Sequence, residues 1–191
     1  AWDARNVARG FPEGQRTGPG SAGPVCDDVR MARLVPPSPP LAVVLVSPQI
    51  PPNTGNVART CAVTGCALHL VGPLGFSLDD RDLRRAGLDY WSEVDPRVHA
   101  GWAEFEARVV RGEHGRLHLF TARAERSVRA ASFAAGDLLV FGQEQLGLPP
   151  ALLAAHPGRC VAIPVLPGQR SLNLAVAVAV GVYEALRSLA G

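Results

Sequence analysis

The chain has 191 residues, which is enough for one well-buried domain and too few for two full ones. Hydrophobic residues make up 47% of the sequence and charged residues 19%, which is the composition of a globular protein and excludes a wholly disordered chain. The formal net charge of +2 excludes a strong overall positive field, although a local basic patch remains compatible with it.

The first 40 residues differ in composition from the rest. Gly, Pro, Arg and Ser dominate residues 1–40, which close on a stiff run of prolines at 36–40. Because this segment holds too little apolar surface to offset the entropy of ordering, we expect it to be disordered. Gly18–Gly23 matches a dinucleotide-binding pattern, but no strand precedes it, so we reject it as a cofactor site. The single methionine, Met31, favours translation beginning there.

From Leu41 onward, short apolar strands alternate with helical patterns. In chain order we expect a strand over Leu41–Val46, a helix over Asn53–Thr64, a strand over Leu68–Val71, a short helix from Ser77 to Gly87, a helix over Trp102–Val110, strands over Leu117–Thr121 and Leu138–Phe141, a helix over Pro149–Ala155, a strand over Val161–Val165 and a helix over Leu172–Leu189. Asn53 or Thr54 is the expected cap of the first helix, and Gly65 its end. This alternation predicts an α/β fold with a parallel sheet flanked by helices, forming one domain over residues 41–191.

The last predicted helix is apolar all round. Such a helix indicates either a subunit interface or a helix central to the monomer, and its composition favours neither. Its longest apolar run, Leu174–Val182, is too short to span a bilayer, and residues 2–23 lack the apolar core of a signal peptide. We therefore expect a cytoplasmic protein without a membrane partner.

The cysteines do not form a metal-binding pattern. Cys61 and Cys66 are four residues apart, and neither a second pair nor a nearby histidine completes a tetrahedral site with Cys26 or Cys160. We expect reduced thiols and no metal.

Three loops carry the polar residues that follow strands. They span residues 47–56, 141–149 and 163–174, and each leads from a predicted strand toward a predicted helix. Because the carboxyl ends of parallel strands meet at one edge of a sheet, we expect these loops to build a single ligand site there. Gly55 allows close approach of the backbone, and Arg59 lies one helical turn beyond Asn56.

Four motifs, at Pro51–Arg59, Arg84–Tyr90, Phe141–Pro149 and Ile163–Leu174, resemble in order and spacing the signatures of SPOUT-superfamily RNA ribose 2'-O-methyltransferases. The likeness is greatest to small tRNA (cytidine/uridine-34-2'-O)-methyltransferases and runs from about Leu41 to the C-terminus. It implies a deep C-terminal trefoil knot, S-adenosylmethionine as cofactor, tRNA bound through its anticodon region and a homodimer formed through the C-terminal helix. Carried over by position, the cofactor contacts are Phe120, Gly142, Ile163 and Ser171, with Leu148, Val165 and Leu172 as additional lining residues.

The resemblance also implies roles in catalysis. A ribose 2'-hydroxyl attacks the activated methyl group, and the protein aligns the two centres. Arg59 orients a phosphate and stabilises the developing alkoxide. Its action as a base stays open, although the high pKa of arginine disfavours that role. Asn53 and Asn173 position the ribose or the arginine, and Glu144 anchors the loops or orients Arg59.

Recognition of RNA is less specified by the sequence. Arg81, Arg84 and Arg85 with Tyr90 and Trp91 form either a phosphate and base-stacking surface or a solvated helix end. The sequence departs from the family pattern at Gln143, Leu146 and Ala175. Two alternatives stay open: a 2'-O-methyltransferase for another tRNA or rRNA position, and a non-catalytic RNA-binding or assembly factor with the same fold.

Overall fold

The computed structural model describes residues 40–78, 91–110 and 115–189. The expected disorder of residues 1–40 and most of the expected helix from Ser77 to Gly87 therefore lie outside the described residues. Ser77 and Leu78, the described start of that segment, are not helical.

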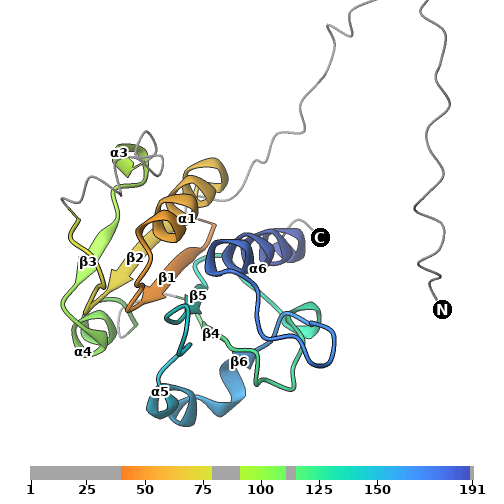
Figure 1. Cartoon of the computed structure of the whole chain (residues 1–191). Helices are drawn as coiled ribbons and strands as arrows, with labels where there is room; N and C mark the ends of the chain where they lie inside the picture. Colours follow the sequence, from red (N-terminus) through yellow and green to blue (C-terminus); the bar gives the residue numbers. More distant parts are fainter. Residues whose placement is uncertain (1–39, 79–90, 111–114, 190–191) are drawn as a thin grey trace, which may run out of the picture. The chain divides into compact units, whose positions relative to one another are not determined.

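The described part of the chain is built on a six-stranded sheet (Figure 1). Its strands are β1 (Ala42–Val46), β2 (Ala67–Val71), β3 (Arg97–His99), β4 (Leu117–Phe120), β5 (Leu138–Phe141) and β6 (Cys160–Val161). They lie in the order β3-β2-β1-β5-β4-β6, and all the pairs are parallel. At the centre, Val43 of β1 is aligned with Leu68 of β2 and Leu139 of β5. The parallel α/β architecture predicted from the sequence is confirmed.

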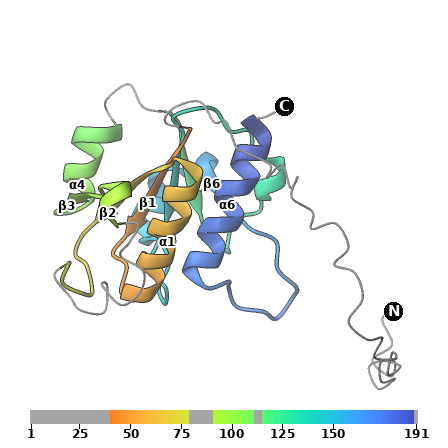
Figure 2. The same cartoon turned by 90° about the horizontal axis from the view of Figure 1, so that it is seen from above.

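Helices cover both faces of this sheet. They are α1 (Pro51–Thr64), α3 (Trp91–Val94), α4 (Trp102–Phe105), which continues as the π-helical turn η3 (Glu106–Val110), α5 (Pro150–Ala155) and α6 (Leu174–Leu189), with 3₁₀ turns η4 (Val128–Ala130) and η5 (Pro157–Arg159). Helices α1 and α6 lie side by side on one face (Figures 1 and 2).

The core has one layer on each face because strand side chains alternate. Val43 and Leu45 point into the layer shared with α1 and α6, where Val178 and Val182 are fully buried. Val44 points to the other face, among side chains of α4, η3 and α5. Burial on both faces explains why β1 is a continuous apolar run rather than an alternating one.

Helix α1 begins earlier than predicted. Its first turn contains Pro51 and Pro52, and the residue before it is Ile50, whose side chain makes no capping bond. Proline suits the first helical turn because that position needs no amide donor. The prediction that Asn53 or Thr54 caps the helix is therefore wrong, and both are buried inside the first turns. Gly65 ends the helix in the left-handed conformation, φ 70°, as predicted.

Helix α6 begins later than predicted, at Leu174 instead of Leu172. The side-chain oxygen of Asn173 accepts hydrogen bonds from the backbone N–H groups of Ala175 (2.9 Å) and Val176 (3.4 Å). These bonds satisfy amides that have no partner within the helix, so Asn173 sets where the helix starts.

Strand order reverses beside β1. The chain runs outward from β1 through β2 to β3 and then returns on the other side of β1, with β5 inserted between β1 and β4. Ligands of open parallel sheets bind outside the carboxyl ends of strands at such a reversal. Within the described ranges, no helix is long and apolar enough to cross a membrane. The knotted threading implied by the family resemblance stays a prediction.

Candidate functional site at the carboxyl edge of the sheet

Glu144 joins the loop after β5 to the loop after β1. One carboxylate oxygen accepts the backbone N–H of Gln49 at 2.9 Å, and the other accepts the N–H of Ile50 and the side-chain amide of Asn53, both at 3.1 Å. Three donors on one carboxylate form charge-assisted hydrogen bonds, which are stronger than neutral ones. Glu144 is therefore a structural link between two strand ends.

Asn53 extends this link to the loop before α6. Its side-chain oxygen accepts a hydrogen bond from the amide of Asn173 at 2.9 Å, across 120 positions of sequence. Asn53 is buried, with a relative exposure of 7%, and both ends of its amide group are bonded. A buried amide without partners would destabilise the fold, so this satisfied chain of Glu144, Asn53 and Asn173 fixes three loops relative to one another. We call it the amide clamp.

The backbone before the clamp is strained. Ser47, which follows β1, has a φ of 52°, and its N–H donates to the carbonyl of Val71 at 2.7 Å. A residue other than glycine rarely adopts this conformation, and such strain persists where the surrounding contacts hold it. The turn at Ser47 directly precedes the two amides that bond Glu144.

A cavity of about 860 Å³ lies beside the clamp. It is bounded by the ends of β4 and β5, the segment 163–172 and the start of α6. Six of the seven residues predicted to contact or line a cofactor site line it, together with Glu144: Phe120, Gly142, Ile163, Val165, Ser171 and Leu172. The structure thus brings these separate sequence motifs to one space.

Leu148 lies elsewhere. Its side chain is 4% exposed and packs with Val44, Val140 and Leu152 in the core layer on the other face of the sheet. The loop after β5 turns back on itself, with reciprocal backbone hydrogen bonds between Gln143 and Gly147. This turn sends Leu148 into the core, so the side chain predicted to line the cofactor site is absent from the cavity lining.

Gly142 is where this turn is tightest. A Cβ atom there would overlap the backbone of Gly147 and Leu148, so only glycine fits without a shift. Phe120 and Phe141 stack below it with ring centroids 4.3 Å apart. On α6, a Cβ at Gly181 would lie 2.9 Å from the Phe120 ring, which shows how closely the helix approaches these aromatics.

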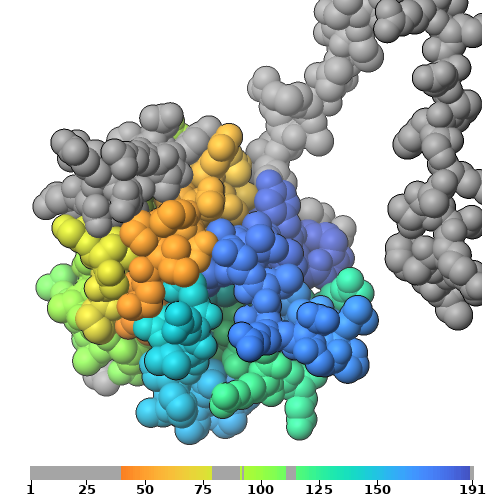
Figure 3. Space-filling view, viewed as in Figure 1, coloured from red at the N-terminus to blue at the C-terminus, as the bar shows by residue number. Residues whose placement is uncertain are grey.

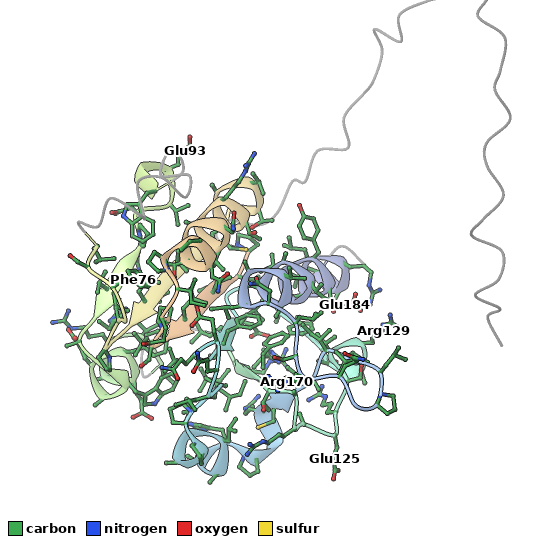
Figure 4. All side chains as sticks on the ribbon, in the orientation of Figure 1. Phe76, Glu93, Glu125, Arg129, Arg170 and Glu184 are labelled. Carbon is green, nitrogen blue, oxygen red and sulfur yellow. The ribbon has the colours of Figure 1, made fainter. Side chains whose placement is uncertain are left out.

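The mouth of the cavity combines exposed apolar and cationic side chains. Leu146, Val165 and Leu172 line it and are 82%, 42% and 39% exposed. Arg123 and Arg170 also line the cavity, and the labelled Arg170 lies between α6 and the strand ends (Figure 4). The site is therefore suited to a ligand that has apolar surface and an anionic group.

Arg59 is exposed on α1, one turn beyond the exposed Asn56, and it is not among the described residues that line the cavity. Arg81, Arg84, Arg85 and Tyr90 lie outside the described residues. Trp91 is half-buried and packs against the core layer of α1 and α6.

The buried histidines lie outside this site. His118 bonds the carboxylate of Asp137 at 2.8 Å, and His69 and His99 share a hydrogen bond of 3.0 Å. Burial lowers the pKa of both His118 and His99. Burial alone would raise the pKa of Asp137, but hydrogen bonds from His118 and from backbone amides outweigh it and lower that pKa. These groups hold strands together.

The described side chains include no cluster of three or more histidine, cysteine, aspartate or glutamate residues that could hold a metal ion. Cys61 and Cys66 are buried thiols, Cys160 is half-buried, and burial raises the pKa of all three.

The reversed parallel sheet, with a cavity at its carboxyl edge, has the arrangement that ligand-binding α/β proteins use. Comparison with known proteins identifies the class. The model of the SpoU rRNA methylase family matches residues 40–183, and the chain belongs to that family.

Two relatives are similar over most of the chain. A tRNA (cytidine(34)-2'-O)-methyltransferase of Acidovorax sp. is 51% identical over 146 residues, covering 76% of this chain and 90% of the relative. A solved structure described as giving insight into the 2-OH methylation of C/U34 on tRNA is 50% identical, with a TM-score of 0.74, over 79% of this chain and 97% of that one.

A third, more distant structure was solved with its cofactor. The AdoMet-bound rRNA methyltransferase of Sinorhizobium meliloti is 26% identical, with a TM-score of 0.66, over 81% of this chain and 58% of its own. The SPOUT-superfamily resemblance stated from the motifs is thus confirmed, and the protein is a methyltransferase.

Proposed function

We propose that this protein transfers a methyl group from S-adenosylmethionine to the ribose 2'-hydroxyl of nucleotide 34, a cytidine or uridine, in tRNA. The observation that carries the proposal is the amide clamp beside the cavity, in a chain that is half identical to relatives named for this reaction. We assign the activity to residues 41–191, with the segment before α6 threaded through the predicted knot.

The cavity fits S-adenosylmethionine in size and chemistry. Its volume of about 860 Å³ falls within the range of roughly 300 to 1,000 Å³ that is typical of small-ligand sites. Ile163 and Leu172 provide apolar walls, while Gly142 lets the loop after β5 fold back closely on itself at the edge of the cavity. When bound there, the cofactor supplies an activated methyl group.

The residues of the chain then position the acceptor. The amide clamp holds the loop of Ser171 and Asn173 at a fixed distance from the loop of Glu144, which preorganises both sides of the cavity. We assign Arg59 to the phosphate next to the reacting ribose, where its charge stabilises the oxygen that loses its proton. Since guanidinium stays protonated, we assign proton removal to solvent or the substrate phosphate.

We also propose that the protein is a homodimer formed through α6. Val176, Val180 and Tyr183 follow one face of this helix and are 48%, 40% and 51% exposed. Such an apolar stripe supports a subunit interface. A tRNA substrate also supports a cytoplasmic location.

The direct test is methyl transfer from labelled S-adenosylmethionine to tRNA transcripts. We expect incorporation that maps to nucleotide 34 and is lost when that nucleotide carries a 2'-deoxyribose. Arg59→Ala should remove most of the activity while leaving cofactor binding intact. Labelling that persists on the deoxy substrate would overturn the proposal. Labelling of rRNA alone would assign the protein to the alternative substrate class.

A further inference from the structure

A second hollow adjoins the cofactor cavity. It has a volume of about 550 Å³ and lies between the segment 121–126 and the α5–η5 segment. The two segments lie next to each other along the lower edge of the space-filling view (Figure 3). We call this hollow the lateral groove.

The groove and the cavity share a wall. Thr121 and Arg123 line both spaces, so the groove and the cavity lie on either side of the same two residues. Pro157 and Gly158 line the far wall, and the space in front of Gly158 is open, since a Cβ added there would meet no atom within 4 Å. Arg123 is therefore within reach both of a ligand unit at the cavity and of the next unit in the groove.

The charge of the groove is mainly positive. Arg123 and Arg126 line it and are exposed, and Arg159 lies in sequence between two further lining residues, Gly158 and Cys160. Among the described residues that line it, Glu125 is the only acidic one, and it points outward from its loop (Figure 4). Arg123 lines both hollows and Arg170 lines the adjoining cavity, so arginine side chains border both spaces.

The backbone that carries these arginines is held in place. The carbonyl of Arg126 accepts the N–H of Ala162 at 2.8 Å, and the N–H of Val128 donates to the carbonyl of Ala162, also at 2.8 Å. The guanidinium of Arg126 donates to the carbonyl of Ala130 at 3.2 Å, which uses one of its five N–H donors. The cationic wall is thus attached to the segment that follows β6.

We propose that the lateral groove binds the sugar-phosphate backbone of the RNA strand next to the methylated nucleotide, with Arg123 and Arg126 on its phosphates. The inference rests on the proposed function, which places one nucleotide at the cavity. Arginine matches phosphate geometry with two parallel hydrogen bonds, and phosphate contacts fix the position of a nucleic acid without reading its bases. The groove therefore sets which ribose reaches the methyl group.

The size of the effect follows from counterion release. For single-stranded RNA, each phosphate contact adds about 0.7 to the slope of log affinity against log salt. At 0.15 M salt, one such contact is then worth about a fourfold change in Kd, and two are worth about 14-fold. Loss of both arginines should therefore weaken binding about 14-fold and lower the slope by about 1.4.

The experiment measures Kd for an unmodified tRNA transcript with a pyrimidine at nucleotide 34, over a series of salt concentrations, with the full chain. The variants are Arg126→Ala and the double variant Arg123→Ala/Arg126→Ala. Arg97→Ala is the matched control, because Arg97 is an exposed arginine on β3 at the opposite edge of the sheet. Glu125→Gln removes a negative charge from the groove, so it should have the opposite effect and bind tRNA up to about fourfold more tightly. Calorimetry with S-adenosylmethionine checks that Arg126→Ala keeps the cofactor site intact.

Weaker tRNA binding and a lower slope for the arginine variants, with Arg97→Ala near wild type, would support the groove. An unchanged slope in the double variant would overturn it, as would an equal loss in Arg97→Ala. Tighter tRNA binding by Glu125→Gln cannot arise from misfolding, so this result would distinguish an effect of charge from an effect of lost stability. If the wild-type protein methylates tRNA and the double variant binds normally, only the groove fails. If the wild type neither binds nor methylates tRNA, both proposals fail.

Discussion

Replacing Glu144 with glutamine tests the amide clamp with the smallest change of shape. The glutamate carboxylate accepts hydrogen bonds from Gln49, Ile50 and Asn53, so both of its oxygens act as acceptors. Glutamine offers one oxygen, and its NH₂ group would face a donor N–H. At least one hydrogen bond is then lost, and the others lose the assistance of the negative charge.

The magnitude follows from these contacts. A hydrogen bond to a charged group contributes about 1.5 to 3 kcal/mol, and Glu144 is half-buried, so water replaces part of what is lost. We expect Glu144→Gln to lower the free energy of unfolding by about 2 kcal/mol. Because the clamp holds two walls of the cavity, we expect the affinity for S-adenosylmethionine to fall as well.

Urea unfolding followed by circular dichroism measures the first quantity, and calorimetry with S-adenosylmethionine measures the second. The matched control is Gln145→Ala, which changes the exposed neighbour in the same loop and should stay within about 0.5 kcal/mol of wild type. If Glu144→Gln unfolds at the same urea concentration as that control, the clamp does not hold the loops.

Three further predictions concern the same region and the core. Asn173→Ala should cost about 1 to 2 kcal/mol in thermal unfolding, because it removes both the cap of α6 and the bond to Asn53. Gly142→Ala should abolish S-adenosylmethionine binding in calorimetry, since its Cβ would overlap the loop backbone; retained binding would show that the turn relaxes. Burial lowers the pKa of His99 and His118 below 6.5, so their contribution to stability is complete above that pH and is lost as the pH falls. The melting temperature should therefore drop between pH 7.5 and 5.5, and a constant value would contradict the buried neutral state of the two rings.

The order of strands and helices was largely predictable from the sequence, because apolar runs buried on both faces differ so clearly from their flanks. Two short elements, α3 and β3, were not predicted. Strand β3 has three residues, two of them exposed, and so carries almost no apolar signal. Strand β6 is shorter than predicted because Ala162 pairs with the segment near Ser127 as an isolated bridge. Short edge elements depend on tertiary pairing, which local patterns do not encode.

The motifs that form the site were predictable from the sequence, but the hydrogen bonds that connect them were not. Asn53 has the residue type and position of a helix cap, yet its amide bonds Glu144 and Asn173, and the two prolines before it start the helix. Local propensity describes neighbours in sequence, whereas this contact joins residues 120 positions apart. Arg123, which lines both hollows, carries no local signal that separates it from other exposed arginines.

The central claim is that this protein methylates the 2'-hydroxyl of nucleotide 34, and nucleoside mass spectrometry tests it most directly. The measurement compares tRNA from cells that carry the gene with tRNA from cells that lack it. We predict that 2'-O-methylcytidine or 2'-O-methyluridine at nucleotide 34 disappears with the gene and returns with the wild-type copy, but not with Arg59→Ala. An unchanged level of the modification in the deletion strain would contradict the account.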